Sequence, residues 1–218
     1  ATLRCEHACP YCQVSRQSTD RRAYDMSIET ADRSLEMVFR SPSPAIKIEF
    51  QGGESMLNFE LIKYVVERAE LINATQRRQL AFVIATNLAV VTDEILEFCA
   101  QHEVYISTSL DGPADLHNIN RPRPGGDSHE RAVDGIERCR AALGVDRVSA
   151  LMTTTKASLG RVRDIIDEYV RLGFSTIFLR ALSPYGFAIK TRSYDSYNVD
   201  EWAAILLRRS GLYPTAQS

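Results

Sequence analysis

The sequence predicts an α/β protein built on a mainly parallel sheet. Short segments with a two-residue hydrophobic period alternate along the chain with longer segments of helical period. Neighbouring parallel strands need a crossover connection, and a helix between two strands supplies one. The chain has 218 residues, a length that suits one hydrophobic core better than two, so we expect a single domain over residues 1–218.

Five strands are expected. They cover residues 46–51, 79–86, 104–109, 148–155 and 176–182. In the first of them, Ile46, Ile48 and Phe50 alternate with polar residues, as in a strand with one buried face. A sixth strand would end at Arg4, with most of it upstream of residue 1. We therefore expect a fragment that is truncated at both ends.

Helices are expected between these strands. Asn58 and Thr92 are typical N-cap residues, and Asp127 with Glu130 resembles a capping box. Gly173 is expected to end a helix that follows Val162. The predicted helices cover residues 58–72, 92–101, 127–143, 162–173 and 200–209, with a polar loop over residues 110–127.

Polar side chains alternate with apolar ones on two of the strands. These polar positions are Lys47, Glu49, Gln51, Tyr105, Ser107 and Ser109. In a barrel covered by helices the outward strand face is apolar, whereas the inward face can be polar where it lines a site. A doubly wound open sheet would cover both faces with helices, which leaves no place for such a polar row. The pattern therefore favours a barrel with an occupied interior.

Charge and cysteine content exclude several classes of function. With 26 Lys and Arg against 28 Asp and Glu, the net charge is −2, which gives no attraction to nucleic acid or to an anionic membrane. The longest uncharged stretch, Leu80–Thr92, is too short to cross a bilayer. Five cysteines are an odd and small number, which argues against a disulfide framework and for a reducing compartment. We expect a cytoplasmic protein with no nucleic-acid or membrane partner.

Three of the five cysteines lie within eight residues, at Cys5, Cys9 and Cys12. Three thiolates are one ligand short of tetrahedral zinc or of a fully ligated iron–sulfur cluster. Two alternatives follow: a 4Fe-4S cluster whose fourth iron is open to another ligand, or a zinc knuckle completed by His7 or by a distant residue. Cys99 and Cys139 share helical faces with apolar residues and are expected in the core.

Several motifs resemble those of radical S-adenosylmethionine (radical SAM) enzymes. The cysteine spacing, with Tyr11 before the third cysteine, is similar to the cluster loop of that family, and Gly52-Gly53-Glu54-Ser55 resembles its glycine–glycine–glutamate motif. Ser109-Leu110-Asp111-Gly112-Pro113, followed by Arg121, resembles a landmark of the peptide-modifying branch, which includes the anaerobic sulfatase maturases. Thr86-Asn87 resembles a threonine–asparagine–glycine element, with Leu88 in place of the glycine.

The resemblance implies a fold, cofactors and site residues. The fold would be a partial (β/α)6 TIM-like barrel with its first strand mostly missing. The cofactors would be a 4Fe-4S cluster, held by the metal ligands Cys5, Cys9 and Cys12, and S-adenosylmethionine, bound by Tyr11, Gly52, Gly53, Glu54, Ser109 and Arg121. The two glycines would let main-chain atoms approach the methionine ammonium. No catalytic residue is assigned.

The resemblance also implies an enzyme. The reduced cluster would cleave S-adenosylmethionine to a 5′-deoxyadenosyl radical, which abstracts hydrogen from a peptide or protein substrate; an external reductant of the flavodoxin or ferredoxin type would supply the electron. Stretches such as Asp25-Met26-Ser27 are most similar to the maturase of the His-Xaa-Ser system. Strand alternation points Glu49, Gln51, Ser107 and Arg180 toward the substrate. The alternatives are a non-catalytic zinc- or iron–sulfur-binding module and an electron carrier.

Overall fold

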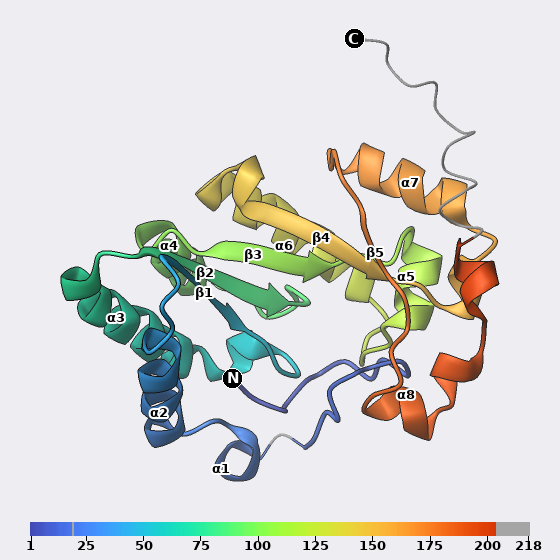
Figure 1. Ribbon diagram of the computed structural model, residues 1–218. Helices are drawn as coiled ribbons and strands as arrows, with labels where there is room; N and C mark the ends of the chain where they lie inside the picture. The colour runs from blue at the N-terminus through green and yellow to red at the C-terminus, as the bar shows by residue number, and fades with distance from the viewer. Residues whose placement is uncertain (19, 204–218) are drawn as a thin grey trace. The chain divides into compact units, whose positions relative to one another are not determined.

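The computed structural model describes residues 1–18 and 20–203 (Figure 1). Its α-helices are α1 (Arg21–Tyr24), α2 (Ile28–Phe39), α3 (Phe59–Gln76), α4 (Asp93–Gln101), α5 (Ala114–Asn120), α6 (Ser128–Leu143), α7 (Val162–Arg171) and α8 (Phe187–Lys190). Its strands are β1 (Ala45–Phe50), β2 (Gln79–Thr86), β3 (Tyr105–Ser109), β4 (Val148–Thr153) and β5 (Phe178–Arg180). Short 3₁₀ helices are η1 (Ser55–Asn58), η2 (Val145–Arg147), η3 (Lys156–Ser158) and η4 (Ser193–Asp195). Among these described residues, no helix has both the length and the apolar character needed to cross a membrane.

The chain divides into two compact units. Unit 1 contains Ala1–Glu6, Arg16–Thr108 and Asp134–Ser149. Unit 2 contains His7–Ser15, Ser109–Val133 and the chain from Ala150 onward. The cysteine loop is thereby shared, because Cys5 belongs to unit 1, whereas Cys9 and Cys12 belong to unit 2.

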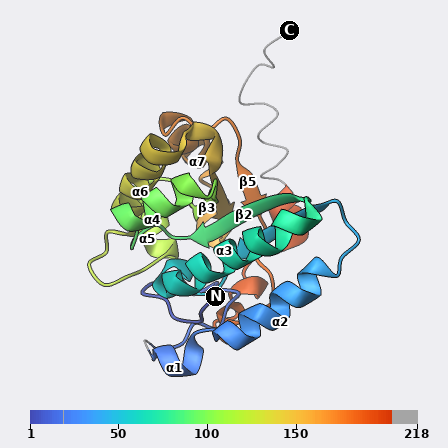
Figure 2. The same ribbon diagram turned by 90° about the vertical axis from the view of Figure 1, so that its left-hand side faces the viewer.

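Unit 1 is built on three parallel strands. β1 pairs with β2, and β2 pairs with β3, in a register that places Glu49 beside Val83 and Ser107 beside Ala85. The alternate residues Ile46, Phe82 and Ile84 are buried. The helices α2 and α3 lie in front of the strands in Figure 2, and Tyr64 of α3 donates a hydrogen bond to Asp32 of α2 at 2.7 Å.

Unit 2 contains the parallel pair of β4 and β5, in which Met152 lies opposite Leu179. Helix α7 packs against this pair through an apolar cluster that includes Ile165 and Tyr169. The Tyr169 hydroxyl donates to the carbonyl oxygen of Leu110 at 2.7 Å, which satisfies the one polar atom of a side chain that is otherwise enclosed by apolar groups.

The predicted strands and long helices are confirmed with shifted ends. β2 has the predicted bounds, whereas β4 and β5 are shorter than predicted. Thr92 caps α4 by accepting from Ile95 N, as predicted, and Gly173 follows α7 with a φ of 72°. Asn58 occupies the N-cap position of α3, but its amide instead donates to the carbonyl oxygen of Ala1 at 3.1 Å.

Among the described residues, four α-helices have no counterpart in the sequence prediction: α1, α2, α5 and α8. α1 and α2 lie in a stretch for which no element was predicted, and α5 interrupts the predicted polar loop. Ser27 caps α2 by accepting from Thr30 N, which is a signal that the sequence carries. The predicted helix over residues 200–209 lies largely outside the described residues. The predicted sixth strand is reduced to isolated bridges at Thr2 and Arg4.

Candidate active site

The first cysteine is positioned by main-chain contacts at the end of β1. Gly53 N donates to the Thr2 carbonyl at 2.8 Å, and Glu54 N donates to the Arg4 carbonyl at 2.7 Å. A methyl group on Gly53 would overlap the Arg4 carbonyl and touch Cys5 Cβ. The glycines are therefore required for the close approach of the segment that carries Cys5, a constraint that exists before any cofactor is considered.

The Glu54 side chain points into the interior of unit 1 and is fully buried. Its carboxylate accepts hydrogen bonds from Thr86 Oγ1 at 2.8 Å and from Asn87 N at 2.7 Å, as well as one from Met56 N. Burial, and then the nearby Glu6 charge, raise the Glu54 pKa to about 7, although the three donors oppose the shift. The Glu54 side chain thus joins the end of β2 to residues 52–54. That the main chain of residues 52–54 binds the cofactor remains a prediction.

Leu88 occupies the position at which the related motif has glycine. Its φ of 62° lies in the left-handed region that glycine adopts readily. The side chain is buried against Gly135 of α6, where a methyl group would lie 2.5 Å from Leu88 Cβ. The glycine in the helix makes the space that the left-handed Leu88 needs in the turn after β2.

The other two cysteines lie on a turn in unit 2. Cys12 N donates to the Cys9 carbonyl at 3.2 Å, and Cys12 Sγ lies 2.8 Å from the Val14 carbonyl. Burial raises the pKa of the Cys9 thiol to about 11, against the opposing charge of Arg121. A metal would reverse this effect, because it binds and stabilises the thiolate.

Asp111 organises the surroundings of this turn. Its fully buried carboxylate accepts from Arg121 Nε at 3.0 Å, from Arg121 Nη2 at 3.2 Å and from Thr153 N at 3.1 Å. The Tyr11 hydroxyl also donates to Asp111. Burial alone would raise the Asp111 pKa, but the Arg121 charge and these donors hold it below its ordinary value. Tyr11, the residue before the third cysteine, is thereby tied to the loop of unit 2 that carries Asp111.

Two of the predicted cofactor residues of unit 2, Tyr11 and Arg121, therefore lie in one cluster. Tyr11 and Arg121 meet at Asp111, and the Arg121 guanidinium carbon lies 5.4 Å from the centroid of the Tyr11 ring. Ser109 ends β3, two residues before Asp111, and is partly exposed. This role of Asp111 is not among those predicted from the sequence. The sequence signal that could have indicated it is an acidic residue within the motif of residues 109–113, followed ten residues later by an arginine.

Residues far along the chain hold the cysteine turn in place. Phe187 N of α8 donates to the Cys12 carbonyl at 2.8 Å, and Thr191 Oγ1 donates to the Pro10 carbonyl at 2.7 Å. Gly186 has a φ of 56°, and a methyl group there would overlap the Gln13 carbonyl. Arg180 of β5 also reaches Gln13, with Nη2 2.5 Å from Oε1. No sequence signal predicted this contact of α8 with the cysteine turn.

The polar side chains that alternate with apolar ones along β1 and β3 lie on one face of the strands of unit 1. Glu49 and Gln51 are exposed and joined by a hydrogen bond of 2.6 Å, and Lys47 lies 3.0 Å from Glu49. The pairing of β2 with β3 places Ser107 on the same face. These side chains share one face of the strands, as the strand alternation predicts, and their contact with a substrate stays a prediction.

The five cysteines divide into two groups, and all are free thiols. Cys99 and Cys139 are fully buried in unit 1, as predicted for core residues, and burial raises their pKa to about 12 and about 11. Cys5, Cys9 and Cys12 are partly exposed. Soft thiolates suit iron–sulfur clusters and zinc, so the donor set fits a 4Fe-4S cluster with one iron left for another ligand.

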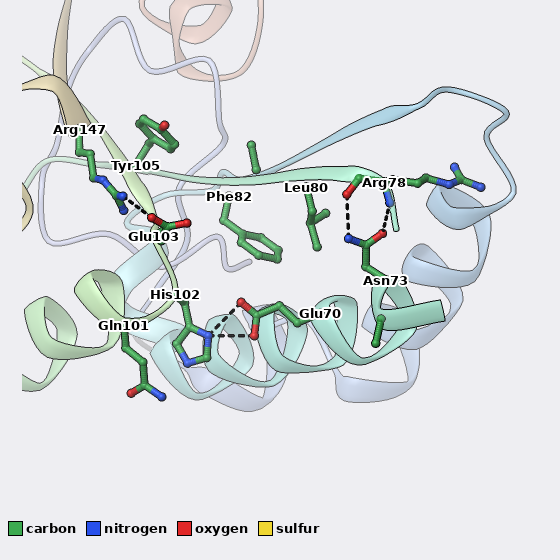
Figure 3. Close-up of a pocket in the computed structure, with 12 residues that line it drawn as sticks. Glu70, Asn73, Arg78, Leu80, Phe82, Gln101, His102, Glu103, Tyr105 and Arg147 are labelled. Atoms are coloured by element: carbon green, nitrogen blue, oxygen red, sulfur yellow. Dashed lines mark hydrogen bonds and ion pairs between the residues drawn. The ribbon is translucent and has the colours of Figure 1, made fainter. Parts of the chain in front are cut away.

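A separate pocket in unit 1 contains none of the predicted site residues (Figure 3). It has a volume of about 510 Å³ and lies between the ends of α3 and α4 and the beginnings of β2 and β3. A hydrogen bond between His102 and Glu70 at 3.0 Å and an ion pair between Arg147 and Glu103 at 2.6 Å line it. Four of the polar side chains that line this pocket are thus engaged with one another in pairs.

Comparison with known proteins places this chain among related enzymes. An uncharacterized protein of Methanothermobacter thermautotrophicus is 28% identical over 97% of this chain and 86% of its own length. The cysteine-type anaerobic sulfatase-maturating enzyme of Clostridium perfringens is 21% identical over 90% of this chain and 56% of that enzyme. A solved structure of native anSMEcpe with bound AdoMet and the Kp18Cys peptide matches with a TM-score of 0.70 and 20% identity, over 84% of this chain and 49% of that one.

This likeness confirms the predicted fold class, an α/β radical SAM fold of the partial TIM-barrel type. The chain spans about half the length of the maturases that it matches. Enzymes of this superfamily use a 4Fe-4S cluster and S-adenosylmethionine. The model of the Radical SAM superfamily matches residues 1–169, which is most of the sequence, and the chain therefore belongs to that superfamily.

Proposed function

We propose that this chain is the core of a radical SAM enzyme that modifies a peptide or protein substrate. The observation that carries the proposal is the division of the cysteines: three partly exposed thiols lie on one loop in a superfamily member, whereas the two others are core residues. Cys5, Cys9 and Cys12 would hold the cluster. When bound, the cluster and S-adenosylmethionine supply a 5′-deoxyadenosyl radical that abstracts a hydrogen atom.

The residues of the chain orient these cofactors. The Asp111–Arg121 pair and the Tyr11 hydroxyl fix the turn that carries Cys9 and Cys12. The main chain of residues 52–54 fixes the segment that ends at Cys5. Ser109, Arg121, Tyr11 and the main chain of residues 52–54 would bind S-adenosylmethionine. Arg121 Nε and Nη2 are occupied by Asp111, so in this proposal Arg121 would contribute its positive charge beside the cofactor's carboxylate rather than this pair of hydrogen bonds.

The proposed substrate is a peptide or protein side chain. The maturase anSMEcpe has been solved with a peptide bound, and the present chain is similar to it. Glu49, Gln51, Ser107 and Arg180 are the proposed substrate-facing residues. An external one-electron reductant of the flavodoxin or ferredoxin type would reduce the cluster. Assignment to the His-Xaa-Ser maturases remains a prediction.

The test is reductive cleavage of S-adenosylmethionine. The anaerobically reconstituted protein should contain about four irons per chain, and with dithionite and S-adenosylmethionine it should release 5′-deoxyadenosine. Cys9→Ala should abolish both iron loading and cleavage, whereas the matched core variant Cys139→Ala should retain both. Stoichiometric zinc without iron would favour the non-catalytic module. A loaded cluster that leaves S-adenosylmethionine intact would favour an electron carrier.

A further inference from the structure

Asn87 is held in one orientation beside the first cysteine. Its Oδ1 accepts a hydrogen bond from Ala89 N at 2.9 Å, and within an amide side chain only the oxygen can accept. The amide nitrogen must therefore occupy the other position, where Nδ2 lies 3.9 Å from Cys5 Sγ and 2.8 Å from Glu6 Oε1. This nitrogen carries two hydrogens, one for each of the two acceptors.

The main chain around Asn87 is fixed as firmly as its side chain. Asn87 N donates to the buried Glu54 carboxylate at 2.7 Å, and Leu88 N donates to Thr86 Oγ1 at 3.0 Å. Leu88 is buried, so the turn cannot swing away without exposing an apolar side chain. The donor is therefore preorganised beside the sulfur of Cys5.

We propose that Asn87 sets the reduction potential of the cluster through an N–H···S hydrogen bond to Cys5, an inference that rests on the proposed function. One-electron reduction adds a negative charge that is spread over the cluster and its thiolates. A donor aimed at a ligating sulfur stabilises the reduced state more than the oxidised state, which raises the potential. Asn87 thereby makes the cluster easier for an external reductant to reduce.

The experiment is a redox titration of the anaerobically reconstituted chain, monitored by electron paramagnetic resonance without S-adenosylmethionine. Asn87→Ala removes the donor, and Asn87→Asp removes it while keeping the oxygen that accepts from Ala89. The matched control is Asn73→Ala, because the Asn73 amide also makes two hydrogen bonds, both to Arg78 main-chain atoms in the pocket of Figure 3.

At the midpoint potential of the unchanged protein, we expect the ratio of reduced to oxidised cluster to fall about two- to tenfold in Asn87→Ala. A tenfold fall corresponds to a midpoint about 59 mV more negative for a one-electron couple. In Asn87→Asp this ratio should fall further, because the substitution adds a negative charge beside the thiolate. In Asn73→Ala the midpoint potential should stay unchanged. Iron content and circular dichroism establish that each variant is loaded and folded.

The outcomes separate this inference from the proposed function. Loaded variants with an unchanged midpoint overturn the role of Asn87 and leave the proposed function standing. Loss of the cluster from both Asn87 variants, while Asn73→Ala loads normally, also overturns it, in favour of a purely structural role. Failure of the unchanged protein to bind iron overturns the proposed function itself.

Discussion

Asp111 and Arg121 form a buried ion pair in which two guanidinium nitrogens meet two carboxylate oxygens, at 3.0 Å and 3.2 Å. The Asp111 side chain is fully buried, and that of Arg121 is 10% exposed. The Tyr11 hydroxyl and the amide of Thr153 complete the coordination of Asp111. A buried ion pair of this kind adds little net stability by its own attraction, whereas removal of one partner is strongly destabilising because the other charge is left buried and unpaired.

Asp111→Asn should lower the free energy of unfolding by about 3 kcal/mol, because it leaves the Arg121 charge buried without its counterion. The matched control is Asp115→Asn, which breaks an exposed, solvent-screened pair with Arg161 and should leave stability nearly unchanged. Urea unfolding measures both. Equal effects of the two substitutions would contradict the central role given to Asp111.

Gly53→Ala should destabilise the segment that carries Cys5, because the new methyl group would overlap the Arg4 carbonyl. We expect slower reconstitution and faster loss of iron to a chelator. Gly160→Ala is the control: its methyl group would have no neighbour within 4 Å, so it should be neutral. The rate of iron release, followed by absorbance, distinguishes the two variants. Identical release rates in Gly53→Ala and Gly160→Ala would refute the steric argument.

Gly135→Ala should cost about 1–3 kcal/mol, since its methyl group would collide with Leu88 Cβ. Leu88→Gly alone should also destabilise, because the loss of a buried side chain outweighs the relief of a left-handed leucine. In the double variant the collision is absent, so its loss should be smaller than the sum of the two single losses. Simple additivity in thermal unfolding would show that the two residues are not coupled.

His117 should make the protein acid-sensitive. Burial lowers its pKa to about 3 from an ordinary value of 6.5, and its Nδ1 accepts from Asp111 N. Between these two values the unfolded chain binds a proton that the folded chain does not, so stability falls as pH falls from about 6.5 to 3. His117→Asn keeps an acceptor and should flatten that slope. Unfolding free energies measured between pH 4 and 7 test this, and an unchanged slope would count against it.

The sequence by itself determined the alternation of strands and helices, and it indicated candidate residues for the site. Hydrophobic period and capping residues are local, so β2 and α4 could be placed from the sequence. The short helix α5 was missed because its flanking loop is polar and its apolar residues are few. The cysteine spacing is local too, and it predicted the metal ligands.

Only the tertiary structure decided which residues meet. Asp111 is one hundred residues from Tyr11, and Asn87 is eighty-two from Cys5, so no local pattern could pair them. The structure also gives the glycines at residues 52–53 a role that the sequence did not predict, since they make room for the N-terminal segment; their contact with the cofactor stays a prediction. These contacts are energetically important because they are buried: a carboxylate or an amide removed from water must find its hydrogen-bond partners within the fold.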